Sequence, residues 1–344
     1  QILAAVAAAA LGFVNEANPM TMRAALCSSY GPVDEVLSVV EDAPRPTFDP
    51  AGKASRGYAL VRVQATALAP GDVRVLSGRT AEIQGPPSLP YVAGGADLCG
   101  VVEAVADGET YLKVGDKVVS QFDRNWGGLA EYALAKSSQC ARNPPAGLSP
   151  AEVAATASSG ASAVVISRHV KRGDRVLVIG GSGGVGTFLV QLARAKGASY
   201  VAAVSTQTEL MAELGAHKAI DYREEDVWAS SEFQAEAGKF DVVFDLVEKG
   251  WDRVTSKGGR AKPIVKTGWR GGRFVTTVRG RSSSGTTGRR TQFAELFALI
   301  EAGDVRVVLD GNRPRSFTTE EVRAAFKLQE SGHAHGKVVV QVAE

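Results

Sequence analysis

The chain has 344 residues, of which 44% are hydrophobic and 22% charged, and its formal net charge is +2. This length predicts two domains, and the composition is that of a soluble globular protein without the overall charge that favours nucleic acid or a membrane surface. Three cysteines, at positions 27, 99 and 140, form no C-x-x-C pair. They exclude a fully paired set of intramolecular disulfides and favour a reducing compartment.

Residues 1–21 are predicted to be a leader or extension that precedes the domains. Ile2 to Val14 is a nearly continuous apolar run, shorter than the roughly 20 residues that cross a bilayer. We expect either the remains of a targeting sequence or a short helix that docks on a partner. The Ala-rich run, together with unpaired cysteines, favours an organelle (plastid or mitochondrion), with the cytoplasm as the alternative location.

The pattern of residues 22–150 predicts a β-rich domain. Apolar residues alternate in 23–40 and 58–68, and shorter strand patterns follow at 101–105, 117–119 and 130–134. Asn143-Pro144-Pro145 marks the end of this domain. Ser149-Pro150-Ala151-Glu152 then has the pattern of a helix start, with Ser149 as N-cap and Glu152 completing a capping box.

From residue 151 the expected helices and strands alternate, which is typical of a doubly wound parallel sheet. The expected helices cover 151–170, 185–196 and 207–214, and the strands 176–179, 200–204, 241–245 and 273–278. Two more helices (291–302 and 319–331) and a last strand (337–342) complete the chain. The sequence therefore predicts an α/β protein in which a β-rich domain precedes a doubly wound domain.

A glycine-rich turn follows the first of these strands and precedes a helix. It reads Gly181-Ser182-Gly183-Gly184-Val185-Gly186 and satisfies the G-x-G-x-x-G fingerprint of dinucleotide sites. Gly181 is expected to form the tight turn, Gly183 to let the backbone approach a pyrophosphate, and Gly186 to let the helix pack on the strand. The helix N-terminus supplies N–H groups for the phosphates.

Several further motifs, in order along the chain, resemble one family. They include Gly95-Ala96-Asp97, Val114-Gly115-Asp116-Lys117, Lys171-Arg172-Gly173-Asp174 and Gly332-His333-Ala334-His335-Gly336-Lys337. The chain is similar to the zinc-independent quinone oxidoreductase (zeta-crystallin-like) and enone reductase group of the medium-chain dehydrogenase/reductase superfamily. The resemblance implies a GroES-like substrate domain (22–150 plus 304–344), a Rossmann NADP-binding domain (151–303), and commonly a homodimer.

No metal is expected. Zinc-binding relatives carry Gly-His-Glu where this chain has Gly95-Ala96-Asp97, and three scattered cysteines cannot form a four-cysteine structural site.

The cofactor prediction rests on the end of the strand at 200–204. NAD enzymes place a carboxylate there for the ribose 2′-hydroxyl, whereas this chain has Ser205 and Thr206 and no carboxylate until Glu209. NADPH is therefore favoured, with Ser205 and Thr206 as donors to its 2′-phosphate. The resemblance implies further contacts, from Tyr222 to that phosphate and from a covering loop that contains Thr277 and Arg279.

For catalysis, the resemblance implies hydride transfer from NADPH to a quinone or an α,β-unsaturated carbonyl. The oxyanion that develops needs a donor or a positive charge. Arg74 stands where relatives often have a Tyr or Lys that faces the site, and Ser162 has the position of a Thr beside the nicotinamide ribose. The chain departs from the family pattern at Ala69, where relatives have Asn, and at Glu248.

A second hypothesis remains open: a catalytically weak NADP(H)-binding member that serves as a structural or regulatory subunit of a larger organellar assembly. Residues 1–14, Ala69 and a basic block favour it. The block, 253–290, has eleven Lys and Arg and no Asp or Glu, and is either a face that docks on a protein partner or a solvated insertion. Its few aromatics argue against nucleic acid.

Overall fold

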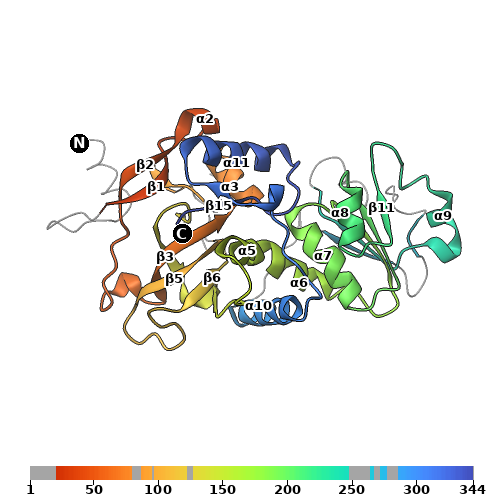
Figure 1. Ribbon diagram of the computed structural model, residues 1–344, viewed down its shortest axis with the longest axis horizontal. Helices are drawn as coiled ribbons and strands as arrows, with labels where there is room; N and C mark the ends of the chain where they lie inside the picture. The colour runs from red at the N-terminus through yellow and green to blue at the C-terminus, as the bar shows by residue number, and fades with distance from the viewer. Residues whose placement is uncertain are drawn as a thin grey trace. The chain divides into compact units, whose positions relative to one another are not determined.

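The structure is a computed structural model that describes residues 21–79, 87–94, 97–121, 127–247, 264–266, 272–276 and 286–343. Residues 1–20, which carry most of the predicted leader, lie outside this range. The described residues form two compact units, drawn in Figure 1. The first contains the described residues up to Ser158, Thr286–Phe293 and those from Leu309 onwards, and the second contains those of Ser159–Gly285 and Ala294–Val308. None of the helices described is long and apolar enough to cross a membrane.

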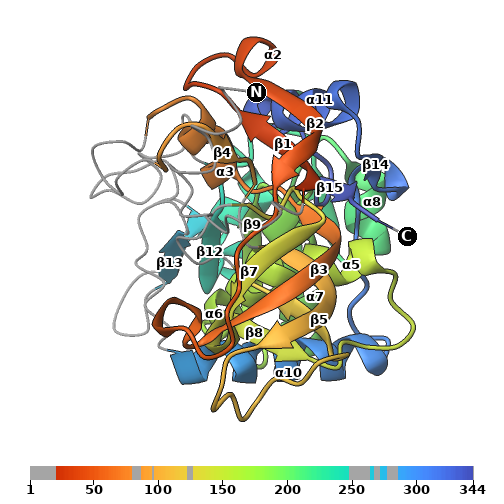
Figure 2. The ribbon, with the colours of Figure 1, turned by 90° about the vertical axis from the view of Figure 1, so that its left-hand side faces the viewer.

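The first unit is built on two sheets, whose long strands face the viewer in Figure 2. A three-stranded sheet has the order β2-β1-β4, and a larger sheet has the order β14-β15-β3-β5-β6-β8, with β7 pairing with β3. The strands are β1 (Thr21–Cys27), β2 (Leu37–Pro44), β3 (Tyr58–Ala67), β4 (Tyr91–Val92), β5 (Leu98–Val105), β6 (Lys117–Ser120), β7 (Tyr132–Lys136), β8 (Cys140–Arg142), β14 (Arg315–Ser316) and β15 (Val339–Gln341).

Short helices accompany these sheets. They are α2 (Val33–Val36), α3 (Pro70–Leu76), α5 (Pro150–Ala155), the first turns of α10 (Thr286–Glu301), α11 (Thr319–Ser331) and the 3-10 turns η1 (Lys53–Ser55), η2 (Ser137–Gln139) and η6 (Asp310–Asn312). Ala59, Val61 and Val63 alternate along β3 into the core, as a strand with one buried face requires. Residues 23–40 form β1 and β2 as predicted, but burial does not alternate strictly along either strand, and α2, which the sequence pattern did not show, separates them.

The second unit is a parallel sheet of order β11-β10-β9-β12-β13. Its elements are α6 (Ala161–Ser167), β9 (Arg175–Ile179), α7 (Gly184–Ala195), β10 (Tyr200–Val204), α8 (Thr208–Glu213), β11 (Lys218–Ile220), α9 (Ser231–Gln234), η4 (Glu236–Gly238), β12 (Val242–Asp245), β13 (Arg273–Thr276) and the rest of α10. The prediction of a doubly wound sheet is confirmed. Residues 277–278 of the last predicted strand lie outside the described range.

The central strand β9 is apolar from Val176 to Ile179, and the packing of its two faces explains this. Val176 and Val178 pack into the core on one face of the sheet, and Leu177 and Ile179 into the core on the other. A parallel strand covered by helices on both faces buries every side chain, so no polar residue alternates with the apolar ones.

The single helix predicted over 151–170 is wrong in its middle. The chain forms α5, then the π-helical segment η3 (Thr156–Gly160), then α6. The Ser149–Glu152 capping box is confirmed at the start of α5. In η3, both the N–H and the hydroxyl of Ser158 donate to the carboxylate of Asp97. This competing acceptor explains why the regular helical hydrogen bonding is interrupted there.

The boundary of the first unit lies at Ser158 rather than at residue 150. The reason is that α5 packs on β3, β5 and β15 of the larger sheet. The first turns of α10, Thr286–Phe293, also cluster with the first unit, and the C-terminal return begins at Leu309 instead of 304.

Candidate nucleotide site and catalytic residues

The turn after β9 is left-handed at Gly180, with φ of 81°. Its N–H and that of Gly181 both donate to the carbonyl oxygen of Val204, each at 3.1 Å. Gly181 lies in this turn, since the N–H of Gly183 donates to the carbonyl oxygen of Gly180 at 3.2 Å, but the left-handed residue is Gly180, one position before the motif. Gly181 is needed for a different reason, because a Cβ atom there would lie 2.7 Å from Sδ of Met211 and 3.1 Å from Cβ of Ala203. Gly180 follows the strand directly but precedes the G-x-G-x-x-G motif. A glycine at the first position after the strand was therefore the sequence signal for the left-handed residue.

Gly186 and Gly183 meet different demands. A Cβ atom at Gly186 would lie 2.2 Å from the carbonyl oxygen of Gly180 and 2.6 Å from that of Gly181, so α7 packs on the turn at a distance that only glycine permits. At Gly183 the nearest atom to such a Cβ, Gly180 O, is 3.5 Å away. A Cβ atom at Gly183 would thus make only an ordinary van der Waals contact, so the surrounding protein does not itself demand glycine there. This fits a position whose backbone a phosphate approaches.

The start of α7 has the features of an anion site. Gly183 is its N-cap, and among the described residues no side chain caps it. Ser182, Gly184 and Val185 are half-exposed, whereas Gly181 and Gly186 are buried. The uncapped N–H groups at the N-terminus of this twelve-residue helix lie at the positive end of the helix dipole. These residues fit the pyrophosphate of a dinucleotide.

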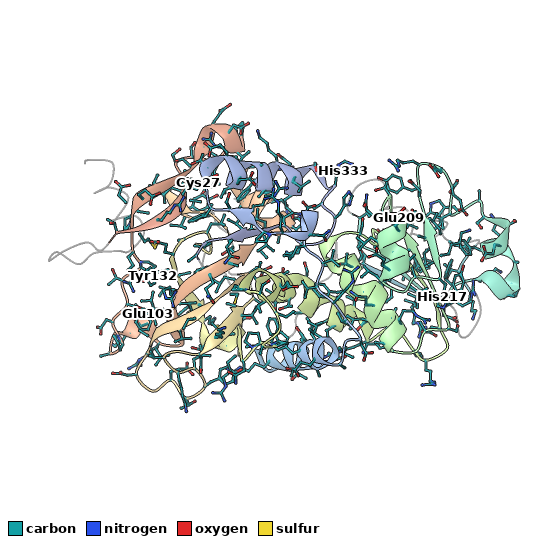
Figure 3. The ribbon with its side chains drawn as sticks, viewed as in Figure 1. Cys27, Glu103, Tyr132, Glu209, His217 and His333 are labelled. Atoms are coloured by element: carbon teal, nitrogen blue, oxygen red, sulfur yellow. The ribbon has the colours of Figure 1, made fainter. Side chains whose placement is uncertain are left out.

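The end of β10 carries the residues predicted to choose the cofactor. Ser205 is buried, its N–H donates to Ile220 O at 2.9 Å, and its Oγ accepts from the N–H of Gln207 at 2.9 Å. Thr206 is half-exposed, and Tyr222, beyond the end of the adjacent β11, is half-exposed with 50% of its surface accessible. The first carboxylate after β10 is Glu209, in α8 (labelled in Figure 3). The strand end therefore fits a nucleotide whose ribose carries a phosphate.

Arg223 is held by its neighbour Asp221 instead of projecting freely. Its Nε lies 3.0 Å from Oδ1 of Asp221 and its Nη2 2.5 Å from Oδ2. The hydrogen bonds from Arg223 lower the pKa of Asp221. The positive charge of Arg223 is therefore balanced locally by this carboxylate.

Parallel strands bring other residues to the same edge of the sheet. Asp245 ends β12, pairs in register with Thr276 of β13, and accepts a hydrogen bond from the N–H of Val247 at 3.1 Å. Asp245 is buried, and the sequence analysis did not single it out. Thr277, Arg279 and Glu248, which it did single out, lie outside the described residues.

The two candidate catalytic residues lie in different units. Arg74 is half-buried in the last turn of α3 in the first unit, where its carbonyl oxygen accepts from the Ser77 hydroxyl. Ser162 is half-exposed in the first turn of α6 in the second unit. Ala69 is the N-cap of α3, and its N–H donates to Asp72 Oδ2 at 2.8 Å. Asp72 therefore acts as a cap on the helix that carries Arg74.

A charge cluster that the motifs did not reveal lies beside α3. Nζ of Lys337 lies 3.8 Å from Oδ2 of Asp97, and both side chains are buried. Burial lowers the pKa of Lys337, and the carboxylates of Asp97 and Asp72 act in the opposite direction. Asp97, at the end of the Gly95-Ala96-Asp97 motif, thus binds an internal ammonium and the donors of Ser158.

Cysteine and metal chemistry find no support in the described residues. No group of three His, Cys, Asp or Glu among them gathers to hold a metal ion. The three cysteines are free and buried. Burial raises the pKa of Cys27 to about 11 and that of Cys99 and Cys140 to about 12, so the thiols stay protonated at neutral pH.

Three cations of the basic block have described side chains, and each contacts its own unit. Lys266 donates to Asp241 at 2.8 Å, Arg273 to Asp174 at 2.5 Å, and Arg290 to the carbonyl oxygen of Ser137 at 3.2 Å. Arg290 also lies over the ring of Tyr111. The other cations of 253–290, like the apolar residues 1–14, lie outside the described part, so the predicted partner surface remains a prediction.

Comparison with known proteins gives relatives over nearly the whole chain. The family described as Zinc-binding dehydrogenase matches residues 214–340, and that described as Alcohol dehydrogenase GroES-like domain matches residues 55–145. The 2-methylene-furan-3-one reductase of Solanum lycopersicum is 34% identical, over 94% of this chain and 79% of its own length. The chloroplastic NADPH-dependent alkenal/one oxidoreductase of Arabidopsis thaliana is 33% identical, over 97% of this chain and 83% of its own.

Solved structures agree on the fold. The crystal structure of Escherichia coli quinone oxidoreductase complexed with NADPH has a TM-score of 0.75 to this chain, covers 93% of it and 99% of its own length, and is 23% identical. At this identity the likeness establishes the GroES-like and Rossmann architecture.

Proposed function

Since the chain belongs to the zinc-independent quinone oxidoreductase and enone reductase group of the medium-chain dehydrogenase/reductase superfamily, we propose that it is an NADPH-dependent reductase of α,β-unsaturated carbonyls and quinones. The observation that carries the proposal is the turn from Gly180 to Gly186, where a side chain is excluded at Gly186 and the start of α7 is left without a side-chain cap among the described residues. The relatives' names supply the substrate class, since they act on an exocyclic enone and on alkenals.

The nucleotide site is proposed to use residues from three places on one edge of the sheet. Gly183, Gly184 and Val185 hold the pyrophosphate with backbone N–H groups, because the start of α7 is uncapped. Ser205, Thr206 and Tyr222 bind the ribose 2′-phosphate, because no carboxylate stands at the end of β10 to repel it. Thr277 and Arg279 cover the nucleotide in this proposal, as the family resemblance implies.

When bound, NADPH would supply the hydride that the β-carbon of an enone accepts. The C=C electron pair would then form the enolate double bond, the carbonyl pair would move onto the oxygen, and a proton from solvent at the α-carbon would give the saturated product. Arg74 is proposed to stabilise the oxyanion with its permanent positive charge, and Ser162 to position the nicotinamide ribose through its hydroxyl. At the start of the helix that carries Arg74, the N–H of Ala69 donates to the buried carboxylate of Asp72, and this bond restricts movement of the first turn.

The test is NADPH consumption by the purified chain with methyl vinyl ketone, with 9,10-phenanthrenequinone, and with the saturated ketone butanone as a matched control. We expect turnover of the first two, none of butanone, and preference for NADPH over NADH. Arg74→Gln and Ser162→Ala test the two roles: the first should lower kcat, and the second should weaken nicotinamide positioning with little change in fold.

Two results would overturn the proposal in different ways. If neither nucleotide binds in a parallel titration, the inference from the glycine turn fails. Tight NADPH binding without turnover of either substrate would favour the subunit hypothesis instead. Location is part of the same proposal: we assign the chain to a plastid or mitochondrion, as one relative is named chloroplastic, and cell fractionation tests this against the cytoplasm.

A further inference from the structure

The buried cluster around Lys337 joins three segments of the first unit that lie far apart in the sequence. Lys337 precedes β15, Asp97 precedes β5, and Asp72 lies in the first turn of α3. The Lys337 side chain is only 4% exposed and that of Asp97 only 3%. A buried ammonium loses its hydration, so it needs nearby carboxylates to remain charged, and the two carboxylates here supply that.

The backbone at the same place is held from both sides. The N–H of Ala67 donates to the carbonyl oxygen of Asp97 at 2.7 Å, and the N–H of Leu68 donates to that of Val338 at 2.9 Å. The next donor, the N–H of Ala69, goes to the Asp72 carboxylate. Three successive residues at the exit of β3 are thus fixed by the residues that form the cluster or adjoin it, and α3 begins directly after them.

Asp97 also reaches the segment that follows α5. Its Oδ2 accepts from the N–H of Ser158 at 3.3 Å and from the Ser158 hydroxyl, besides facing Lys337. Without the ammonium, this carboxylate would lose the positive charge that faces it 3.8 Å away. Asp97 thus connects the ion pair to the π-helical segment η3 through its carboxylate and to the exit of β3 through its carbonyl oxygen.

We propose that Lys337 is a positioning residue for the reduction: its buried ammonium, 3.8 Å from the Asp97 carboxylate, holds the residues at the exit of β3 and so the start of α3, the helix that carries Arg74. The inference rests on the proposed function, because that function assigns to Arg74 the stabilisation of the oxyanion. Lys337 itself touches no substrate. Displacements of about 1 Å at a reacting group can lower a rate as much as 10²-fold, so a loosened α3 should act on kcat.

The experiment compares Lys337→Met with Leu112→Ala. Met has a similar length without the charge, whereas Leu112 is a buried core residue of the same unit outside the cluster, and its truncation costs about 2–5 kcal/mol. The two variants are thereby comparable in stability loss. Both are assayed well below their unfolding temperatures, for kcat with methyl vinyl ketone and for the Kd of NADPH by fluorescence titration.

We expect Lys337→Met to lower kcat at least about tenfold while the Kd of NADPH stays within about twofold, since the glycine turn belongs to the second unit. Leu112→Ala should leave both values near those of the unchanged chain. Equal losses of kcat in the two variants, or no loss in Lys337→Met, would overturn the inference. Absence of turnover in the unchanged chain is a different result and strikes the proposed function instead.

Asp97→Asn keeps the inference testable if Lys337→Met does not fold. It removes the negative charge that faces Lys337 and keeps an oxygen that can accept from Ser158. A fall in kcat of about threefold or more, at unchanged Kd for NADPH, supports the positioning role. An unchanged kcat contradicts it.

Discussion

The glycine turn of the second unit and the charge cluster of the first unit both bring parts of the chain into close contact inside the protein. They do so in opposite ways. At the turn, Gly186 supplies the close approach because it has no side chain. In the cluster, Lys337 and Asp97 bring their segments together because two oppositely charged side chains meet inside the protein.

The difference lies in what each arrangement tolerates. A turn that requires glycine is destabilised when a side-chain atom is added, and the loss of stability grows with the steric overlap. A buried ion pair fails when one partner is removed, because the remaining charge is left without its countercharge. The turn should therefore be sensitive to enlargement, and the cluster to deletion.

Deleting a carboxylate from the cluster should give the largest loss of stability. Asp97→Ala removes the carboxylate 3.8 Å from the Lys337 ammonium and the acceptor of both donors of Ser158, and we expect a cost of about 3–5 kcal/mol. Chemical denaturation measures it. The matched control is Asp34→Ala, since Asp34 Oδ2 lies 2.7 Å from Nζ of Lys327 in an exposed pair of the same unit, which contributes at most about 1 kcal/mol. Similar losses in both variants would contradict the assignment of a buried, interdependent cluster.

Enlarging the turn should cost less stability but more binding. Gly186→Ala adds a Cβ atom 2.2 Å from a carbonyl oxygen, which we expect to cost about 1–3 kcal/mol and to weaken NADPH binding. Gly183→Ala is the control within the same loop, because the nearest atom to its Cβ, Gly180 O, would be 3.5 Å away, an ordinary van der Waals contact. It should keep the stability of the unchanged chain and lose only NADPH affinity. A stability loss in Gly183→Ala as large as in Gly186→Ala would show that the contacts of the turn are not as described.

The cysteines separate the two regions experimentally, because all three lie in the first unit (Cys27 is labelled in Figure 3). Burial raises their pKa values, so iodoacetamide at about pH 8 should not label the native chain. Asp97→Ala should increase the labelling rate through opening of the first unit, and Gly186→Ala should not. Rapid labelling of the unchanged chain would contradict the burial of these thiols.

The sequence revealed the turn and not the cluster for a physical reason. The residues of the turn are consecutive, and each has a conformational demand that a short pattern records. Even there the pattern did not include the left-handed residue of the turn, Gly180, which precedes the motif. Asp97 and Lys337 become neighbours only when β5 and β15 pair on either side of β3. No local spacing records such a pairing, so neither the ion pair nor the interruption of the helix at η3 was predictable.

The smallest expected effect is a pH dependence at the far end of the second unit's strands. Val201 N–H donates to Nδ1 of His217 at 2.9 Å, Nη1 of Arg194 lies 2.9 Å from Nε2, and the ring stacks on Tyr200 (His217 is labelled in Figure 3). Burial lowers the pKa of His217, and the charge of Arg194 lowers it further. Protonation would place a hydrogen against the Val201 N–H and a second positive charge beside Arg194.

The sign of the effect follows from these contacts. Below the ordinary histidine pKa of about 6.5 the unfolded chain takes up a proton that the folded chain resists. The free energy of unfolding should therefore fall as the pH is lowered from about 7.5 to 5.5, and His217→Gln should reduce that fall. His333→Gln, at an exposed position, serves as the control and should keep it. Because His217 is exposed and Asp97 is buried, the effect of His217 should be much smaller than that of Asp97→Ala. An equal effect would mean that burial does not set the cost of a misplaced charge in this protein.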